Sequence, residues 1–179
     1  MSAVSGWPFM DRRTAAVLIL IAAAATIGGA LVFQHGFGYQ PCKLCLWQRN
    51  PYYLAMPVAL ATALTPPRSA WSRIGLGLLA LIFLVSAGLG AYHAGVEWGF
   101  WPGPSDCGGA SAPAAGDMGD FLRSLERTRV VSCTEAAWRF LGLSLAGWNV
   151  VISLALAALA AALSGLTDRR AVPNGLKAR

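Results

Sequence analysis

The sequence predicts an all-α integral membrane protein, a four-helix bundle with a long outer loop that carries a short amphipathic helix. Two observations predict this fold class. Hydrophobic residues make up 56% of the 179 residues and charged residues only 12%, whereas about 25% of the residues of an ordinary soluble domain are charged. The apolar residues are also gathered into long uncharged blocks. We therefore expect one transmembrane domain over residues 1–179.

Three of the blocks are long enough to cross a bilayer, which takes about 20 apolar residues. They predict a first span at residues 15–33, a third at 74–92 and a fourth at 140–163. The first block could instead be a secretory signal, because two arginines precede it. Its apolar run is longer than a signal core of about 7 to 15 residues and no polar cleavage region follows directly, so a span is favoured.

The second predicted span, residues 44–64, is the weakest of the four. Only residues 52–64 form a clean apolar block, so this helix crosses the bilayer only if it begins upstream near Cys42. Pro51 and Pro57 each remove a backbone donor and would kink the helix, which membrane helices tolerate where neighbours satisfy the freed carbonyls. A re-entrant segment stays open as an alternative, although an even number of spans argues against it.

The distribution of charge predicts which side of the membrane each loop faces. With four spans and both termini on one side, that side carries eight basic and two acidic residues, a net charge of +6, while the outer loops carry six of each. Short basic loops are retained in the cytoplasm. We therefore expect cytoplasmic termini, and the basic composition reflects topology rather than binding of nucleic acid.

All four cysteines then lie on the outer side, in or beside the predicted loops at residues 34–44 and 93–139. They are Cys42, Cys45, Cys107 and Cys133. In a bacterial-type envelope that side is oxidising, so paired cysteines there are expected to form disulfides. The chain around Cys107 is rich in glycine, alanine and serine, which predicts an accessible thiol on a flexible tether.

The segment DMGDFLRSLERTR, residues 117–129, predicts the short amphipathic helix of the long loop. Its apolar residues recur at helical spacing, and Asp117 stands where an N-cap is expected. The helix is expected to lie flat on the membrane or to pack on neighbouring protein. In either case it would hold Cys133 near the bilayer surface while Cys107 stays on its tether.

The motif PCKLCLWQRNP, residues 41–51, indicates redox chemistry at the membrane edge. Its Cys-x-x-Cys pair begins a helix, where the N-terminal partial charge favours thiolate. Arg49 follows Cys45 by one turn, so its cation makes Cys45 the better thiolate candidate. A cation beside a sulfur at this depth suits an amphipathic electron acceptor such as a quinone. His93, at the outer end of the third span, could exchange a proton with a quinone oxygen.

Other interpretations of these residues stay open. Four cysteines could close a zinc site, but the second pair has no tight knuckle and would lie in an oxidising compartment, so no metal is predicted. The disulfides could be purely structural, in a membrane scaffold or transporter. Arg49 could instead reach to lipid headgroups, and His93 could be a satisfied interfacial histidine. His35 has no argument beyond its place in the first loop.

The whole pattern resembles the disulfide bond formation protein B family of bacterial inner membranes. The resemblance covers residues 15–166 and rests on the four-span layout, PCKLCLWQR before the second span, a lone cysteine in the long loop, and VVSCTEAAWRFLGLSLAGWN before the fourth. It implies a protein-disulfide:quinone oxidoreductase that reoxidises a periplasmic thioredoxin-fold dithiol oxidase, disulfide bond formation protein A. Ubiquinone is favoured over menaquinone. The vitamin K epoxide reductase type fits less well, because its motif lies late in the bundle.

The resemblance also implies residue roles. Cys107 and Cys133 would exchange with the partner, Cys107 being the sulfur attacked, and Cys42 and Cys45 would form the quinone-coupled pair, with Cys45 as the thiolate at the ring. Gln48 stands where some members carry an acid and is given no role. The implied site comprises four catalytic cysteines and two further quinone-binding residues: Cys42, Cys45, Cys107, Cys133, Arg49 and His93.

Overall fold

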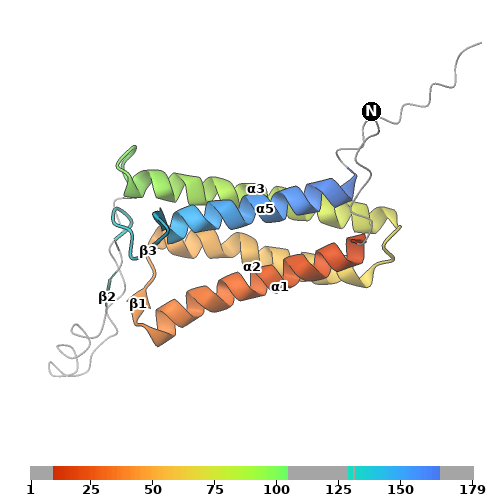
Figure 1. Ribbon diagram of the computed structural model, residues 1–179, viewed down its shortest axis with the longest axis horizontal. Coiled ribbons are helices and arrows are strands. Elements are labelled where there is room, and N and C mark those ends of the chain that lie inside the picture. Colours follow the sequence, from red (N-terminus) through yellow and green to blue (C-terminus); the bar gives the residue numbers. More distant parts are fainter. Residues whose placement is uncertain (1–9, 105–128, 131, 166–179) are drawn as a thin grey trace, which may run out of the picture.

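The computed structural model describes residues 10–104, 129–130 and 132–165 of the 179. Most of them belong to long helices that lie side by side (Figure 1). The helices are α1 (Arg12–Leu31), continued by the π-helical turn η1 (Val32–Gly36), α2 (Lys43–Leu64), α3 (Ala70–Glu97) and α5 (Leu145–Ser164). The predicted helical class is confirmed for the described residues.

Two short strand pairs lie at one end of these helices (Figure 1). β1 (Tyr39–Gln40) pairs in parallel with β2 (Arg129–Val130), and β3 (Arg139–Phe140) pairs antiparallel with β4 (Leu143–Ser144). The predicted amphipathic helix at residues 117–129 lies outside the described residues except for Arg129, which belongs to β2. The first pair ties the segment between α1 and α2 to the long loop.

Three segments within the described ranges are long and apolar enough to cross a membrane: Arg12–Gly36, Ala70–Glu97 and Leu145–Ser164. They overlap the first, third and fourth predicted spans. α2 is not among them, in keeping with the weak apolar pattern of the second predicted span. It nevertheless begins at Lys43 and runs for 22 residues through both Pro51 and Pro57, which makes it as long as α1 or α5.

Small residues hold the helices together. Each of α1, α2 and α5 has three or more buried alanines, among them Ala23, Ala59 and Ala160, each 0% exposed. Small side chains allow close helix approach in membranes, where packing rather than expulsion of water drives association. Larger apolar side chains such as Ile21 and Leu81 are 58% exposed. This pattern suits a bundle surrounded by lipid.

The two ends of the helices differ in chemistry. At one end, which we call the arginine end, three guanidinium groups cap helix C-termini: Arg12 donates to the carbonyl of Leu163, Arg13 to that of Ala63 and Arg73 to that of Ser164. Cations there complement the negative end of the helix dipole. At the opposite end α2 begins and α3 ends, and we call it the cysteine end.

Three of the four long helices among the described residues have an oxygen-bearing N-cap residue, and α2 has a cysteine instead. α1, α3 and α5 begin after Asp11, Ser69 and Ser144, whose side-chain oxygens accept a backbone N–H of the first turn, as N-caps ordinarily do. α2 begins after Cys42, whose Sγ accepts the backbone N–H of Cys45 at 3.2 Å. The first cysteine of the motif is therefore the N-cap of its helix.

Candidate active site

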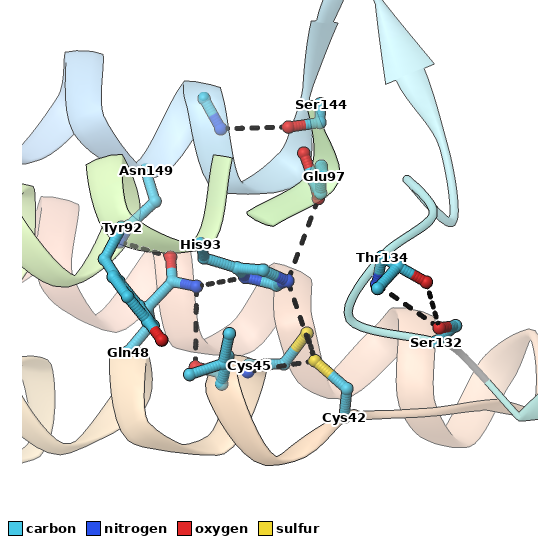
Figure 2. A network of polar contacts seen from close by, with 12 residues as sticks. Cys42, Cys45, Gln48, Tyr92, His93, Glu97, Ser132, Thr134, Ser144 and Asn149 are labelled. Atoms are coloured by element: carbon cyan, nitrogen blue, oxygen red, sulfur yellow. Dashed lines mark hydrogen bonds and ion pairs between the residues drawn. The ribbon is translucent and has the colours of Figure 1, made fainter. Parts of the chain in front are cut away.

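The Cys42–Cys45 pair lies at the N-terminus of α2 (Figure 2). The two Sγ atoms are 2.8 Å apart and both thiols are free. Cys42 is buried and its Sγ lies 3.8 Å from Nε2 of His93. The hydrogen bond with Cys45 is the main cause that lowers the pKa of Cys42 to about 5, with smaller help from His93 and against the opposing effect of burial.

The structure offers an argument for Cys42 as the thiolate of the reduced pair, whereas the sequence favoured Cys45. Cys45 was favoured because Arg49 follows it by one turn, but the backbone N–H that the helix N-terminus offers goes to Cys42, the N-cap. Arg49 is half-buried and its Nη1 donates to Oε1 of Gln34 at 2.6 Å. In the reduced pair the negative charge is therefore best accommodated on Cys42.

His93 is held in one tautomer by Gln48. Nε2 of Gln48 lies 2.6 Å from His93 Nδ1 and 3.4 Å from the carbonyl of Leu44, and its Oε1 accepts from Nδ2 of Asn149 at 2.7 Å. A carbonyl can only accept, so the amide nitrogen must be the atom that faces His93. His93 Nδ1 then accepts, and the neutral ring carries its proton on Nε2, toward Cys42.

The support for Gln48 extends across three helices. Asn149 of α5 accepts from the hydroxyl of Tyr52 on α2 at 2.7 Å, and Ser153 joins the same cluster through contacts with Tyr52 and with Ser86 of α3. Each polar group here has a partner, as a site buried away from water requires. Gln48 was given no role from the sequence, and Asn149, 101 residues away, carried no local signal.

Glu97 ends α3 one turn after His93. Its side chain is only 4% exposed, and its Oε1 lies 3.8 Å from Nε2 of His93. Its Oε2 is buried and has no hydrogen-bond partner among the described residues. Figure 2 shows the ring of His93 between Glu97 and Cys42. The sequence did not lead us to Glu97, although its spacing of four residues from His93 was visible.

A cavity of about 320 Å³ lies beside these groups. Its walls are mostly apolar and aromatic and come from η1, α1, α2 and α5 as well as the segment before β3. One end is polar. The lining includes the aromatic residues Phe33, Trp138 and Trp148 and the polar residues Cys45, Gln48, Arg49, His93 and Glu97. Cys45, but not Cys42, is part of this lining.

The remaining predicted site residues are Cys133 and Cys107. Cys133 is disulfide-bonded and fully buried, in one apolar cluster with Cys42, Leu44 and Val96. Cys107 lies outside the described residues. Three of the four predicted catalytic cysteines, together with Arg49 and His93, thus meet at the cysteine end, while His35 is exposed on η1.

The same cluster has the spacing of a metal site, because the ligand atoms of Cys42, Cys45 and His93 lie within 4.8 Å of one another. A metal would need a lone pair on Nε2 of His93. The donor from Gln48 to Nδ1 keeps the proton on Nε2 instead. The local hydrogen bonds therefore favour a thiol–imidazole pair.

The family model and the relatives that the chain matches point to the same protein family. Residues 12–163 match the family model described as "Disulfide bond formation protein DsbB". Three similar relatives are each named "Disulfide bond formation protein B". The one from Marinobacter nauticus is 31% identical over 79% of this chain and 85% of its own length. Those from Xanthomonas oryzae pv. oryzae and Azoarcus sp. are 34% and 30% identical, over 87% and 84% of this chain and 91% and 90% of their own lengths.

Proposed function

The chain belongs to the disulfide bond formation protein B family, and from this premise we propose that it is a protein-disulfide:quinone oxidoreductase of the bacterial inner membrane. Membership makes it a membrane protein of disulfide bond formation. The proposed reaction reoxidises a periplasmic thioredoxin-fold dithiol oxidase of the disulfide bond formation protein A type. Two electrons per disulfide then pass to a membrane quinone, for which we expect ubiquinone rather than menaquinone.

The observation that carries this proposal is a dithiol beside a cavity that suits a quinone. A quinone has a flat apolar ring and two carbonyl oxygens that accept hydrogen bonds. The cavity offers aromatic and aliphatic walls for the ring and the guanidinium of Arg49 as a donor, and His93 also belongs to its lining. These residues fit the group, and when bound it would supply the two-electron acceptor.

Each sulfur has a distinct place in the proposed sequence. The partner would reduce the loop pair by attack on Cys107, leaving Cys133 to act as the next nucleophile. Cys42 and Cys133 pack in one buried cluster, so attack of a Cys133 thiolate on Cys42 would break the Cys42–Cys45 disulfide and release Cys45 as the thiolate. Cys45 lines the cavity, which supports the sequence-based expectation that Cys45 is the sulfur in contact with the acceptor.

We also propose a topology in which four helices, α2 included, cross the membrane with both termini in the cytoplasm. The arginine end, where the three guanidinium groups cap helix C-termini, would then lie on the cytoplasmic side, and the cysteine end would face the periplasm. Such an orientation agrees with retention of basic segments inside. It would place the thiols in the oxidising compartment and keep the cavity at the depth of the bilayer.

The test is reoxidation of a reduced periplasmic dithiol oxidase by the purified protein in detergent without oxygen. With the partner in large excess, we expect its thiols to be lost beyond the amount that the protein's own disulfides can oxidise only when quinone is added, and we expect this catalytic loss to be absent in a Cys42→Ser, Cys45→Ser double variant. The control is the same reaction with the quinone replaced by its quinol. Catalytic oxidation of the partner that needs no quinone would contradict the proposed electron acceptor, and no oxidation at all by the wild-type protein would favour a scaffold or transporter with structural disulfides.

A further inference from the structure

Glu97 lies between two cavities at the cysteine end. It belongs to the lining of the cavity of about 320 Å³ beside the Cys42–Cys45 pair. It also lines a second cavity of about 560 Å³, formed by residues 96–103 and Thr134, beyond the end of α3. Among the described residues that line the second cavity Glu97 is the only ionisable one. We propose that Glu97 carries protons between the two cavities during oxidation of the dithiol, an inference that rests on the proposed function.

The geometry of Glu97 suits proton carriage. Its Oε1 lies 3.8 Å from Nε2 of His93, while Oε2 is buried without a partner among the described residues. Buried polar atoms nearly always have partners, and such an exception calls for an explanation. A carboxyl oxygen with no existing hydrogen bond can take up and release a proton without breaking one.

The proton balance of the proposed reaction calls for a second proton besides the one that the thiol supplies. Conversion of a quinone to a quinol takes up two electrons and two protons, and both electrons come from Cys42 and Cys45 as they form a disulfide. With Cys42 as thiolate and Cys45 as thiol, the sulfurs supply one proton. Glu97, if protonated, supplies the second and becomes a carboxylate, and a proton from the second cavity restores it. Charge is conserved, since one thiolate is replaced by one carboxylate.

Few other groups near Glu97 can exchange protons. Among the described residues that line the cavity beside the cysteine pair, the other charged or titratable groups include Cys45 and Arg49 from α2 and His93 from α3, and Cys42 lies 3.8 Å from His93. From β1 and α2 the cavity lining adds two tyrosines, Tyr39 and Tyr52, and from α5 it adds none. A guanidinium does not release its proton near neutral pH, and the proton on Nε2 of His93 is held toward Cys42 by the donor from Gln48. Among the described residues that line the two cavities, Glu97 is the only acid.

The proposal is tested first without any quinone. Infrared difference spectra between the oxidised and the phosphine-reduced protein should contain a carbonyl band of a protonated carboxyl group that shifts in D₂O. The band should be absent in Glu97→Gln and present in Glu135→Gln, which removes an exposed glutamate at the same end of the helices. A band that persists in Glu97→Gln would overturn the assignment.

Kinetics of a single turnover provide the second readout. In Glu97→Gln the oxidation of the dithiol by quinone should slow by about 100-fold, the range for loss of a positioned proton donor, with quinone binding unchanged. Glu97→Asp should be intermediate, and a small carboxylic acid such as acetic acid should accelerate Glu97→Gln while sodium chloride at the same ionic strength should not. Wild-type turnover combined with unchanged rates in Glu97→Gln would overturn the proton role alone. A wild-type protein that does not reduce quinone would overturn the proposed function itself.

Discussion

Replacing Gln48 by leucine should raise the pKa of the Cys42 thiol by about one unit. Gln48 keeps the proton of neutral His93 on Nε2, 3.8 Å from the sulfur. Leucine has a similar size but no donor, so the proton can move to Nδ1 and leave a lone pair facing Cys42. A hydrogen bond to a charged group contributes about 1.5–3 kcal/mol. A contact of 3.8 Å is long, so we take the lower end, and about 1.4 kcal/mol corresponds to one pKa unit.

The assay is the rate of alkylation of the reduced protein as a function of pH, with peptide mass spectrometry to separate Cys42 from Cys45. The thiolate is the reactive form, so the midpoint for wild-type Cys42 is expected at a pH of about 5, and that for Gln48→Leu about one unit higher. Thr26→Val is the matched control, because Thr26 lines the same cavity and its hydroxyl donates to the carbonyl of Ala22 in its own helix. Equal midpoints in wild type and Gln48→Leu would refute the tautomer reasoning.

Three further predictions concern electron transfer, exchange and packing. Arg49→Met should raise the apparent KM for quinone more than that for the dithiol partner, because it removes a donor from the cavity lining; steady-state kinetics that leave both constants unchanged would reduce Arg49 to an anchor. Cys133→Ala should let a mixed disulfide between Cys107 and the partner persist on non-reducing gels, and a species that maps to Cys42 would reverse the order of the pairs. Gly75→Leu should cost about 1–3 kcal/mol in denaturant unfolding, because a Cβ at Gly75 would collide with Thr62, and Gly88→Leu, where space is open, should cost less.

The helices, and a cysteine pair at the start of α2, could be predicted from the sequence. Uncharged apolar blocks require backbone groups to be paired within the segment, which in lipid means a helix, and α1, α3 and α5 overlap those blocks. The motif at residues 41–51 likewise indicated a cysteine pair at a helix start. These inferences depend only on local composition and spacing.

The thiolate position could not be predicted so well. Helix spacing puts Arg49 one turn after Cys45, which favoured Cys45. Cys42 is the N-cap only because the first helical residue is Lys43. The motif contains no serine, threonine or aspartate that would mark the cap position in the sequence. Because Cys42 takes the cap position, it receives the backbone donor, which favours a thiolate at Cys42 in the reduced pair.

Partners distant in the sequence escaped prediction for a different reason. Gln48 and Asn149 meet only because α2 and α5 pack at one depth, and neither residue has a neighbour in the sequence that indicates such a contact. Glu97 could have been found, since residues four apart on a helix share a face and His93 was already a candidate. Its burial, which makes it chemically interesting, is a property of the packed end of α3 and not of the sequence pattern.

The most direct test is an anaerobic titration of the reduced protein with quinone, with quinol formation followed by ultraviolet absorbance and remaining thiols counted by alkylation. The proposed function predicts one quinol for each pair of thiols lost, with Cys42 and Cys45 recovered as the disulfide-linked peptides. A Cys45→Ser variant should form no quinol in this single turnover. Loss of the Cys42 and Cys45 thiols without quinol formation, or equal quinol formation in the variant, would contradict it.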